Sequence, residues 1–271
     1  MTDQVDNLAV GQRQRTRQDI LEWFSPLQPG EAHSSVASTR LEGTCQQMLN
    51  DTSFIAWREG SAPSNVILAH GVPGAGKTVL TSFVIDEIIE ASEDDIALAF
   101  IYIGQHRKEA EEEQCFLAAI IKQWCAHLTN IPQPLNLLFQ KHHGKSTRPS
   151  VGELHQVLTE VHRHVPRKFL IVDALDECNS SVRKSVVNII QLLLRNQDTN
   201  ANTKVFVSCR SHLIPALEKQ LKPVCMDVKA ADSDITLYLS NAIAESDASS
   251  ELSPEFRKEL ISTILAGAKG M

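Results

Sequence analysis

The residues with the clearest chemical meaning form one glycine-rich segment, GVPGAGKT, at residues 71–78. Its spacing is G-x-x-x-x-G-K-[ST], in which glycines let backbone N–H groups turn inward around a polyphosphate. The lysine of such a loop reaches the terminal phosphates, and the hydroxyl of the last residue ligates Mg²⁺. We therefore expect a nucleotide to bind here, and the alternative is a glycine-rich turn without a ligand. The expected binding residues are Gly71, Val72, Pro73, Gly74, Ala75, Gly76, Lys77 and Thr78, with Lys77 also catalytic and Thr78 also a metal ligand.

Three carboxylates follow an apolar run in the segment FLIVDALDE, residues 169–177. Because a parallel sheet binds its ligand at the carboxyl ends of its strands, we expect Asp173 to hold Mg²⁺ beside Thr78. Asp176 and Glu177 are expected to polarise an attacking water as general bases. The alternative for this pair is that it only caps the next helix.

Arg210 closes a further apolar segment, VFVSCR, at residues 205–210. An arginine at the end of a strand beside the γ-phosphate can sense that phosphate and stabilise the charge of the transition state. The alternative is an ordinary surface arginine. We expect Arg210 to act with Lys77 and the acidic pair.

The elements that must position these residues alternate along the chain. Short apolar runs without internal alternation predict strands that are buried on both faces, and amphipathic helices are predicted between them. This order predicts an α/β fold with a parallel five-stranded sheet flanked by helices. The glycine-rich segment joins the first strand to a helix over residues 78–90, as its chemistry requires. The predicted strands are 66–69, 96–103, 169–172, 205–207 and 224–228.

The two ends of the chain differ from this central pattern. Residues 1–19 are polar, and we expect a tail whose arginines Arg13, Arg15 and Arg17 form a solvated helix face, with a phosphate-binding arm as the alternative. After residue 228 the pattern becomes helical. The expected domains are a tail (1–19), a helical lead (20–62), a nucleotide-binding core (63–230) and a helical lid that looks truncated (231–271).

Composition excludes several classes of protein. Of 271 residues, 42% are hydrophobic, 22% are charged and 5% are aromatic, and the net charge is −7. This balance supports a sizeable core and argues against a general nucleic-acid binder. The six cysteines contain no C-x-x-C pair, and the ten histidines are expected to be surface or core residues. We find no signal sequence or membrane span and expect a cytoplasmic protein.

Taken together, the glycine-rich loop and the segments FLIVDALDEC and VFVSCR resemble the NACHT group of signal-transduction NTPases, in its fungal, nephrocystin-like branch. The resemblance covers about residues 20–271 and includes Arg40 with Gly43-Thr44, and ADSDI at residues 231–235. It implies a P-loop NTPase of the ASCE/STAND type with an additional strand in its sheet, followed by a small helical subdomain.

The resemblance also implies a function. Such proteins rest with ADP, assemble with ATP and Mg²⁺, and hydrolyse ATP slowly, and fungal members act in non-self recognition and cell death. By position, Lys77 and Thr78 are the P-loop pair, Asp173 is the magnesium acid, Asp176 and Glu177 are the hydrolytic pair, and Arg210 is the sensor. Family members continue Gly-Thr with glycine and tryptophan, whereas Cys45 and glutamine follow here, in a region expected near the nucleotide base.

Three functional readings remain open at this point. The leading one is a slow regulatory ATPase that works with protein partners or by self-association. The second is a non-catalytic nucleotide-binding interaction module. A small-molecule kinase is the third, although no arginine-dense lid segment is present. A GTPase is disfavoured because no N/T-K-x-D segment occurs.

Overall fold

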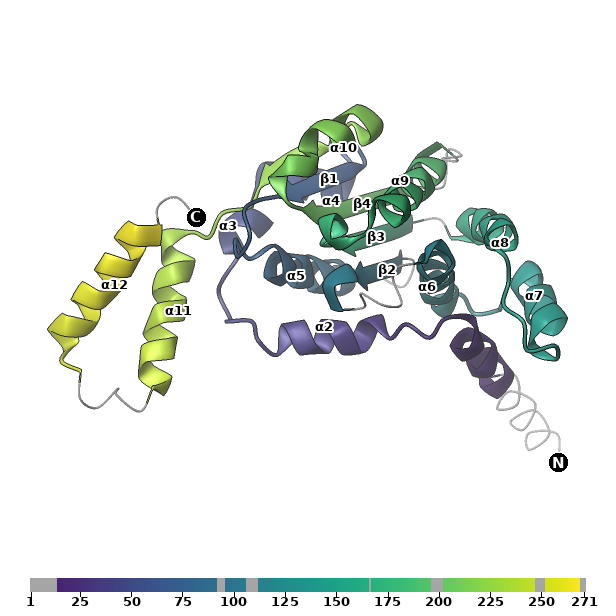
Figure 1. Cartoon of the computed structure of the whole chain (residues 1–271), viewed down its shortest axis with the longest axis horizontal. Coiled ribbons are helices and arrows are strands. Elements are labelled where there is room, and N and C mark those ends of the chain that lie inside the picture. The colour runs from purple at the N-terminus through teal and green to yellow at the C-terminus, as the bar shows by residue number, and fades with distance from the viewer. Residues whose placement is uncertain are drawn as a thin grey trace.

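The computed structural model describes residues 14–91, 96–105, 112–165, 167–195, 202–246 and 252–268. Figure 1 shows an α/β body, with the helices α11 and α12 projecting from one side of it. The predicted loop and both strand-end segments lie within the described residues. Arg13 and the last three residues of the chain lie outside them.

The body is built on five parallel strands in the order β2-β3-β4-β1-β5. β4 lies between β1, which leads into the glycine-rich loop, and β3, which ends at Asp173. This position of β4 is the additional-strand arrangement that the resemblance implies, so the predicted fold class is confirmed. The strands are β1 (Val66–His70), β2 (Ile96–Tyr102), β3 (Arg167–Asp173), β4 (Asn202–Cys209) and β5 (Val224–Asp227).

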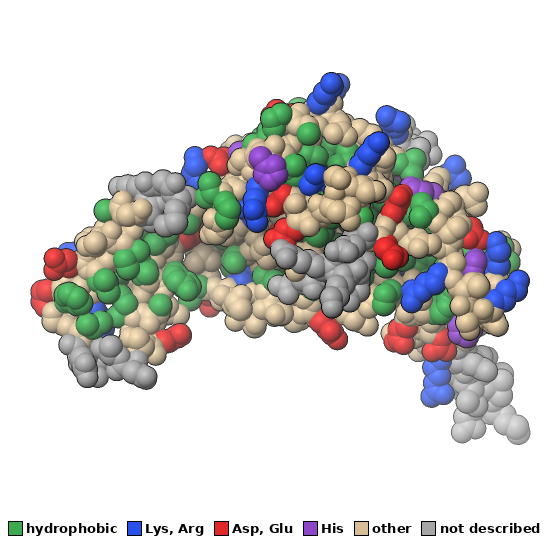
Figure 2. Space-filling model, viewed as in Figure 1, with side chains coloured by type: hydrophobic (Ala, Val, Ile, Leu, Met, Phe, Trp, Pro, Cys, Tyr) green, Lys and Arg blue, Asp and Glu red, His purple; other side chains and the backbone are tan. Residues whose placement is uncertain are grey.

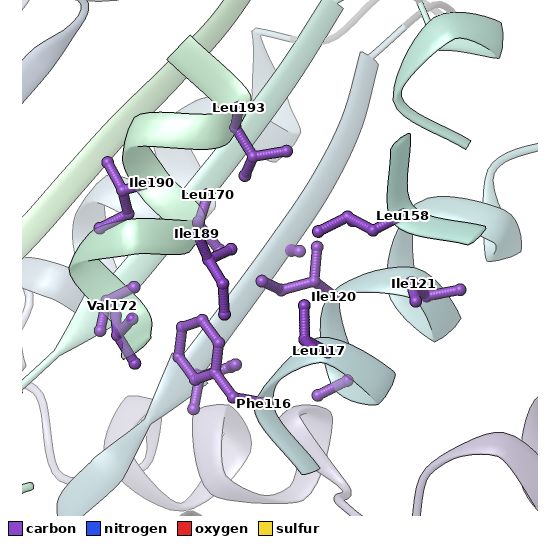
Figure 3. Close-up of a cluster of buried hydrophobic side chains, with 14 of the residues drawn as sticks. Phe116, Leu117, Ile120, Ile121, Leu158, Leu170, Val172, Ile189, Ile190 and Leu193 are labelled. Atoms are coloured by element: carbon purple, nitrogen blue, oxygen red, sulfur yellow. The ribbon is translucent and has the colours of Figure 1, made fainter. Parts of the chain in front are cut away.

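Alternate residues of the strands point to opposite faces, and each face has its own apolar core. On one face, α6, α9 and α10 pack on the sheet, α8 packs on α6, and α7 packs on α8. Figure 3 shows how Phe116 and Ile120 of α6 meet Leu170 of β3 and Ile189 of α9. The bounds are α6 (Glu113–Ala126), α7 (Gln133–His143), α8 (Val151–His164), α9 (Ser180–Arg195) and α10 (Ile214–Leu221).

The opposite face is covered by the helix that follows the glycine-rich loop, α5, and by α2 and α4. Trp57 of α4 is 1% exposed, and its indole N–H donates to the carbonyl of Asn65 just ahead of β1. This contact fixes α4 against the first strand, since a buried indole N–H needs an acceptor. The bounds are α2 (Pro29–Ala37), α3 (Gln46–Leu49), α4 (Thr52–Glu59) and α5 (Lys77–Glu90).

The N-terminal segment differs from its predicted solvated face. Residues 14–24 are helical, and Arg17 NH2 donates to the carbonyls of Cys125, Ala126 and Leu128, at 3.3, 2.5 and 3.0 Å. Carbonyls at the end of a helix lack partners within it, so the guanidinium satisfies the end of α6. For Arg17, the expected solvated face was therefore wrong.

The projecting hairpin consists of α11 (Asp232–Glu245) and α12 (Pro254–Ala268). These helices pack on each other, and no described side chain of either is buried. Figure 2 shows hydrophobic side chains gathered on this lobe. Among the described residues, no helix is both long and apolar enough to cross a membrane.

Candidate functional site

The glycine-rich loop runs from the end of β1 into α5. Gly74 and Gly76 have φ angles of 81° and 87°, a conformation that side chains rarely allow. A Cβ on Gly71 would lie 2.5 Å from the carbonyl oxygen of Val228, so only glycine fits there. Lys77 Nζ donates to the carbonyls of Gly71 and Val72, at 3.0 and 2.9 Å. The amine is therefore held over its own loop.

The carboxylate of Asp173 is 3% exposed and accepts three hydroxyl hydrogen bonds. Thr78 Oγ1 donates to Oδ2 at 2.8 Å, and Thr81 Oγ1 and Ser208 Oγ donate to Oδ1 at 2.9 and 2.6 Å. Burial raises the pKa of Asp173, the three hydroxyls oppose that rise, and Glu177 adds to it. A carboxylate paired with the Thr78 hydroxyl is a set of hard oxygen donors, and such a set fits Mg²⁺.

Asp176 and Glu177 lie on the short helix η2 (Leu175–Glu177) and have different surroundings. The carboxylate of Asp176 is 5% exposed and pairs with Arg210, whose Nε lies 3.0 Å from Oδ2 and whose backbone N–H donates to Oδ1 at 3.0 Å. Glu177 instead packs against Gly104, where an added Cβ would lie 3.0 Å from Oε2. Ala174 makes the turn that leads into η2, with a φ of 58°.

A cavity of about 310 Å³ brings the three predicted segments together. Asp173 lies outside its lining and reaches it through Thr78 and Ser208. We call this cavity the phosphate cleft. Gly71, Val72 and Ala75 also lie outside its lining, which consists of Pro73, Gly74, Gly76, Lys77, Thr78, Val79, Ala174, Asp176, Glu177, Ser208 and Arg210.

A second cavity of about 280 Å³ lies on the other side of the loop and shares Gly74, Gly76 and Val79 with the phosphate cleft. Its walls come from residues 39–48, from residues 228–230 and from α11. Asp234 of α11 accepts the backbone N–H of Cys45 at 2.9 Å, which ties two of these walls together. We call this cavity the second pocket. Burial, aided by Asp234, raises the pKa of the Cys45 thiol to about 11.

Three residues of this site were not among the sequence candidates. Thr81 stands four positions after Lys77 and three after Thr78, so helical spacing places it on the same face of α5 and offered a signal. Ser208 precedes the predicted sensor by two residues. Its hydroxyl accepts the N–H of Ala174 at 2.8 Å while it donates to Asp173. Gly104 follows β2 at a point where the sequence gives no signal.

The model of the family described as nephrocystin 3, N-terminal, matches residues 43–210. The chain belongs to this family. The matched residues run from the edge of the second pocket to Arg210 and contain the entire lining of the phosphate cleft. With its sheet order and loop geometry, the chain is a P-loop NTPase of the ASCE kind.

Among curated proteins, none matches the chain. Solved structures similar to it include Cdc6p from Pyrobaculum aerophilum, with a TM-score of 0.48 and 14% identity over 75% of this chain and 50% of that one. A Walker-type ATPase from Pyrococcus abyssi gives 0.45 and 13% over 74% and 60%, and PCH-2 from C. elegans gives 0.43 and 14% over 89% and 59%. The chain thus spans half to three fifths of these solved chains.

Proposed function

We propose that the chain is a nucleotide-dependent switch of the NACHT type that binds ATP or ADP with Mg²⁺ and hydrolyses ATP slowly. The observation that carries the proposal is the phosphate cleft, in which Lys77 and Thr78 face Glu177 and Arg210. The second pocket adjoins it across the glycine-rich loop. A nucleotide lying over this loop would place its phosphates in the cleft and its base in the second pocket.

The phosphate end would be held by the loop and the buried acid. Lys77 already donates to two carbonyls, and a phosphate would replace them as a stronger, charged acceptor. Thr78 and Asp173 would hold Mg²⁺, which when bound neutralises phosphate charge. The N-terminus of α5 adds positive potential at the same place.

Of the two adjacent acids, Glu177 would contribute more to hydrolysis than Asp176. Both acids line the cleft; the carboxylate of Asp176 is engaged by Arg210 through two contacts, and that of Glu177 lies beside Gly104. We therefore assign the role of general base to Glu177 and the role of orienting Arg210 to Asp176. Arg210, with 48% of its side chain exposed, would stabilise the charge that develops on the phosphate.

The base end would connect the core with the hairpin. Residues of α11, including Asp234, Ile235 and Tyr238, form one wall of the second pocket. A bound base would therefore contact the core and the hairpin together, so that binding or loss of the nucleotide would change the position of α11. A moved α11 could then contact protein partners or further copies of the chain. Such contacts would provide a signalling role of the kind that the resemblance implies for fungal non-self recognition or cell death.

Substitution of Lys77 tests the proposal directly. Lys77→Ala should weaken ADP and ATP binding at least about 100-fold, because a charge-assisted contact to phosphate is lost from a cleft made for it. Titration calorimetry measures the affinity, and Lys219→Ala, an exposed lysine of α10, is the matched control. An unchanged affinity of Lys77→Ala would refute the proposal.

Turnover then separates the alternatives. Release of phosphate from ATP supports the switch, while binding without any release favours the non-catalytic interaction module. Transfer of the phosphate to an acceptor other than water would indicate a kinase. Competition between ATP and GTP for the same site decides whether the base is adenine.

A further inference from the structure

Four polar side chains from separate parts of the chain form a continuous line beneath the second pocket. His33 of α2 lies with Nε2 2.9 Å from Asp86 Oδ1 and with Nδ1 3.0 Å from the hydroxyl of Tyr102. The other oxygen of Asp86, Oδ2, lies 2.5 Å from Arg40 NH1. The line therefore runs from the end of β2, through α2 and α5, to Arg40.

Aromatic rings hold both ends of this line. The imidazole of His33 lies against Phe100 and Tyr102, with ring centroids at 5.4 and 6.2 Å. The guanidinium of Arg40 lies over the ring of Phe83, 4.5 Å from its centroid. These contacts leave 14% of the His33 side chain and 17% of the Arg40 side chain exposed. Both groups are consequently confined to one arrangement.

One tautomer of the His33 ring gives both of its nitrogens a hydrogen-bond partner. Its Nε2–H donates to Asp86, and its Nδ1 accepts the hydroxyl proton of Tyr102. Asp86 is then an acceptor at both oxygens, one facing His33 and one facing Arg40. His33 thus fixes the Asp86 carboxylate at one oxygen, while the other oxygen holds Arg40.

Arg40 lines the second pocket, whereas Asp86 and His33 do not. A guanidinium carries five N–H donors, and its pairing with Asp86 leaves donors for a ligand. The same pocket offers an acceptor at Asp234 and the ring of Tyr238. Ring nitrogens of a purine accept hydrogen bonds, so a base in the pocket matches the donors of Arg40.

We propose that Asp86 is a positioning residue for base recognition: supported by His33, it holds Arg40 where a base in the second pocket accepts hydrogen bonds from it. The inference rests on the proposed function, because it requires that this pocket receives the base. Asp86 itself would touch no ligand. Its loss should therefore weaken the binding of ligands that carry a base and leave the binding of base-free phosphates unchanged.

The test compares two ligands that each present two linked phosphates, of which only one carries a base. ADP and inorganic pyrophosphate are titrated calorimetrically, each with Mg²⁺, into the wild-type chain and into Asp86→Asn. We expect about tenfold weaker ADP binding and pyrophosphate binding within twofold of wild type, since the variant loses a charged contact only at the base. Glu87→Gln is the matched control, because it neutralises the next residue of α5, which pairs with Arg58 instead. It should change neither affinity.

A double-mutant cycle ties the effect to Arg40. Arg40→Ala should reproduce the selective loss of ADP affinity, and adding Asp86→Asn to it should cause no further loss. Should Asp86→Asn fail to fold, His33→Phe keeps the ring between Phe100 and Tyr102 and removes both nitrogen contacts. It should still weaken ADP selectively, by a few-fold.

Each contrary outcome has a separate meaning. Equal losses for both ligands, or no loss for either, overturn the positioning role. If the wild-type chain binds pyrophosphate as tightly as ADP, the second pocket contributes nothing and this inference fails, while phosphate binding stands. If the wild-type chain binds neither ligand, the proposed function fails and this inference fails with it.

Discussion

The strand β3 carries a buried charge near each of its ends, and the two charges have different surroundings. At the carboxyl end, Asp173 accepts hydrogen bonds from three hydroxyls, two of which belong to Thr78 and Ser208 in the lining of the phosphate cleft. At the amino end, Lys168 is 0% exposed and donates to the carbonyls of His162 and Val165. On β4, Lys204, which stands opposite Phe169, is 5% exposed and donates to the carbonyl of Arg58.

The two buried charges differ in whether their hydrogen-bond partners can be replaced by a ligand. Hydroxyls rotate, and those around Asp173 can turn their protons elsewhere while the carboxylate takes a cation. Backbone carbonyls belong to the fold itself, so the ammonium of Lys168 can leave them only if the chain opens. A buried charge with exchangeable partners suits a ligand site, and one with backbone partners suits a structural tie.

The largest expected effect is a loss of stability at the amino end. Lys168→Glu places a carboxylate against the carbonyls of His162 and Val165, and we expect unfolding to become about 3 to 5 kcal/mol easier, because a buried charge loses its partners. Urea denaturation measures the change. Lys184→Glu, at an exposed position of α9, makes the same change in charge and should cost far less. Similar losses of stability in both variants would contradict a special structural role for Lys168.

At the carboxyl end, the next largest effect should fall on chemistry and leave stability alone. Glu177→Gln should lower ATP turnover about 100-fold and leave ADP affinity within twofold, because the amide keeps the shape but cannot accept a proton. Steady-state phosphate release and calorimetry measure the two quantities. Turnover equal to that of the wild-type chain would remove the role of base from Glu177 and return it to Asp176.

A smaller effect should appear in the pH dependence of stability. Burial lowers the pKa values of Lys168 and Lys204 to about 8. Between about pH 8 and 10.5 the unfolded chain therefore binds more protons, so each lysine makes the folded state more stable as pH rises, by at most about 1.4 kcal/mol per pH unit. Denaturation of wild type and Lys168→Met from pH 7.5 to 10 isolates the Lys168 contribution. A difference in unfolding free energy between the two proteins that stays constant across this pH range would contradict a lowered pKa of Lys168.

The smallest effect that we predict is a gain. Burial raises the pKa of Asp173, so its charged form weakens the folded state above the pKa of the unfolded chain. In the absence of nucleotide, Asp173→Asn should therefore be more stable than wild type at pH 7. The gain should shrink as pH falls to about 4, where the unfolded carboxyl also protonates. A less stable variant at pH 7 would mean that the three hydroxyls outweigh burial.

Much of the fold could be predicted because its strands are uninterrupted apolar runs that follow one another at helix-length intervals. Helices α2, α7 and α10 are hard to predict from the sequence for a common reason. Each has a proline in its first turn. Proline ends one helix and equally well begins the next, since its missing N–H has no partner in the first turn.

The candidate site divides in the same way. The phosphate cleft could be predicted because its residues are grouped in three short segments at strand ends, where a parallel sheet gathers them. The second pocket was indicated only in part. The resemblance includes Arg40 and the segment that contains Asp234, and it places the region at Cys45 near the base, whereas Asp86 holds Arg40 from outside the pocket and belongs to no recognisable spacing. The pairing of Asp176 with Arg210 is likewise a matter of side-chain geometry. Which of two adjacent acids pairs with Arg210 cannot be read from their order.

The close approach of Gly71 to the carbonyl of Val228 has a consequence for the order in which the chain is made. The glycine-rich loop leaves the ribosome early, but its rear boundary is supplied by backbone 157 residues later, from position 71 to position 228. β5 must therefore be synthesised and paired with β1 before the loop has its final walls. A nascent chain that ends between residues 210 and 228 would contain every residue of the phosphate cleft and would still lack a finished site.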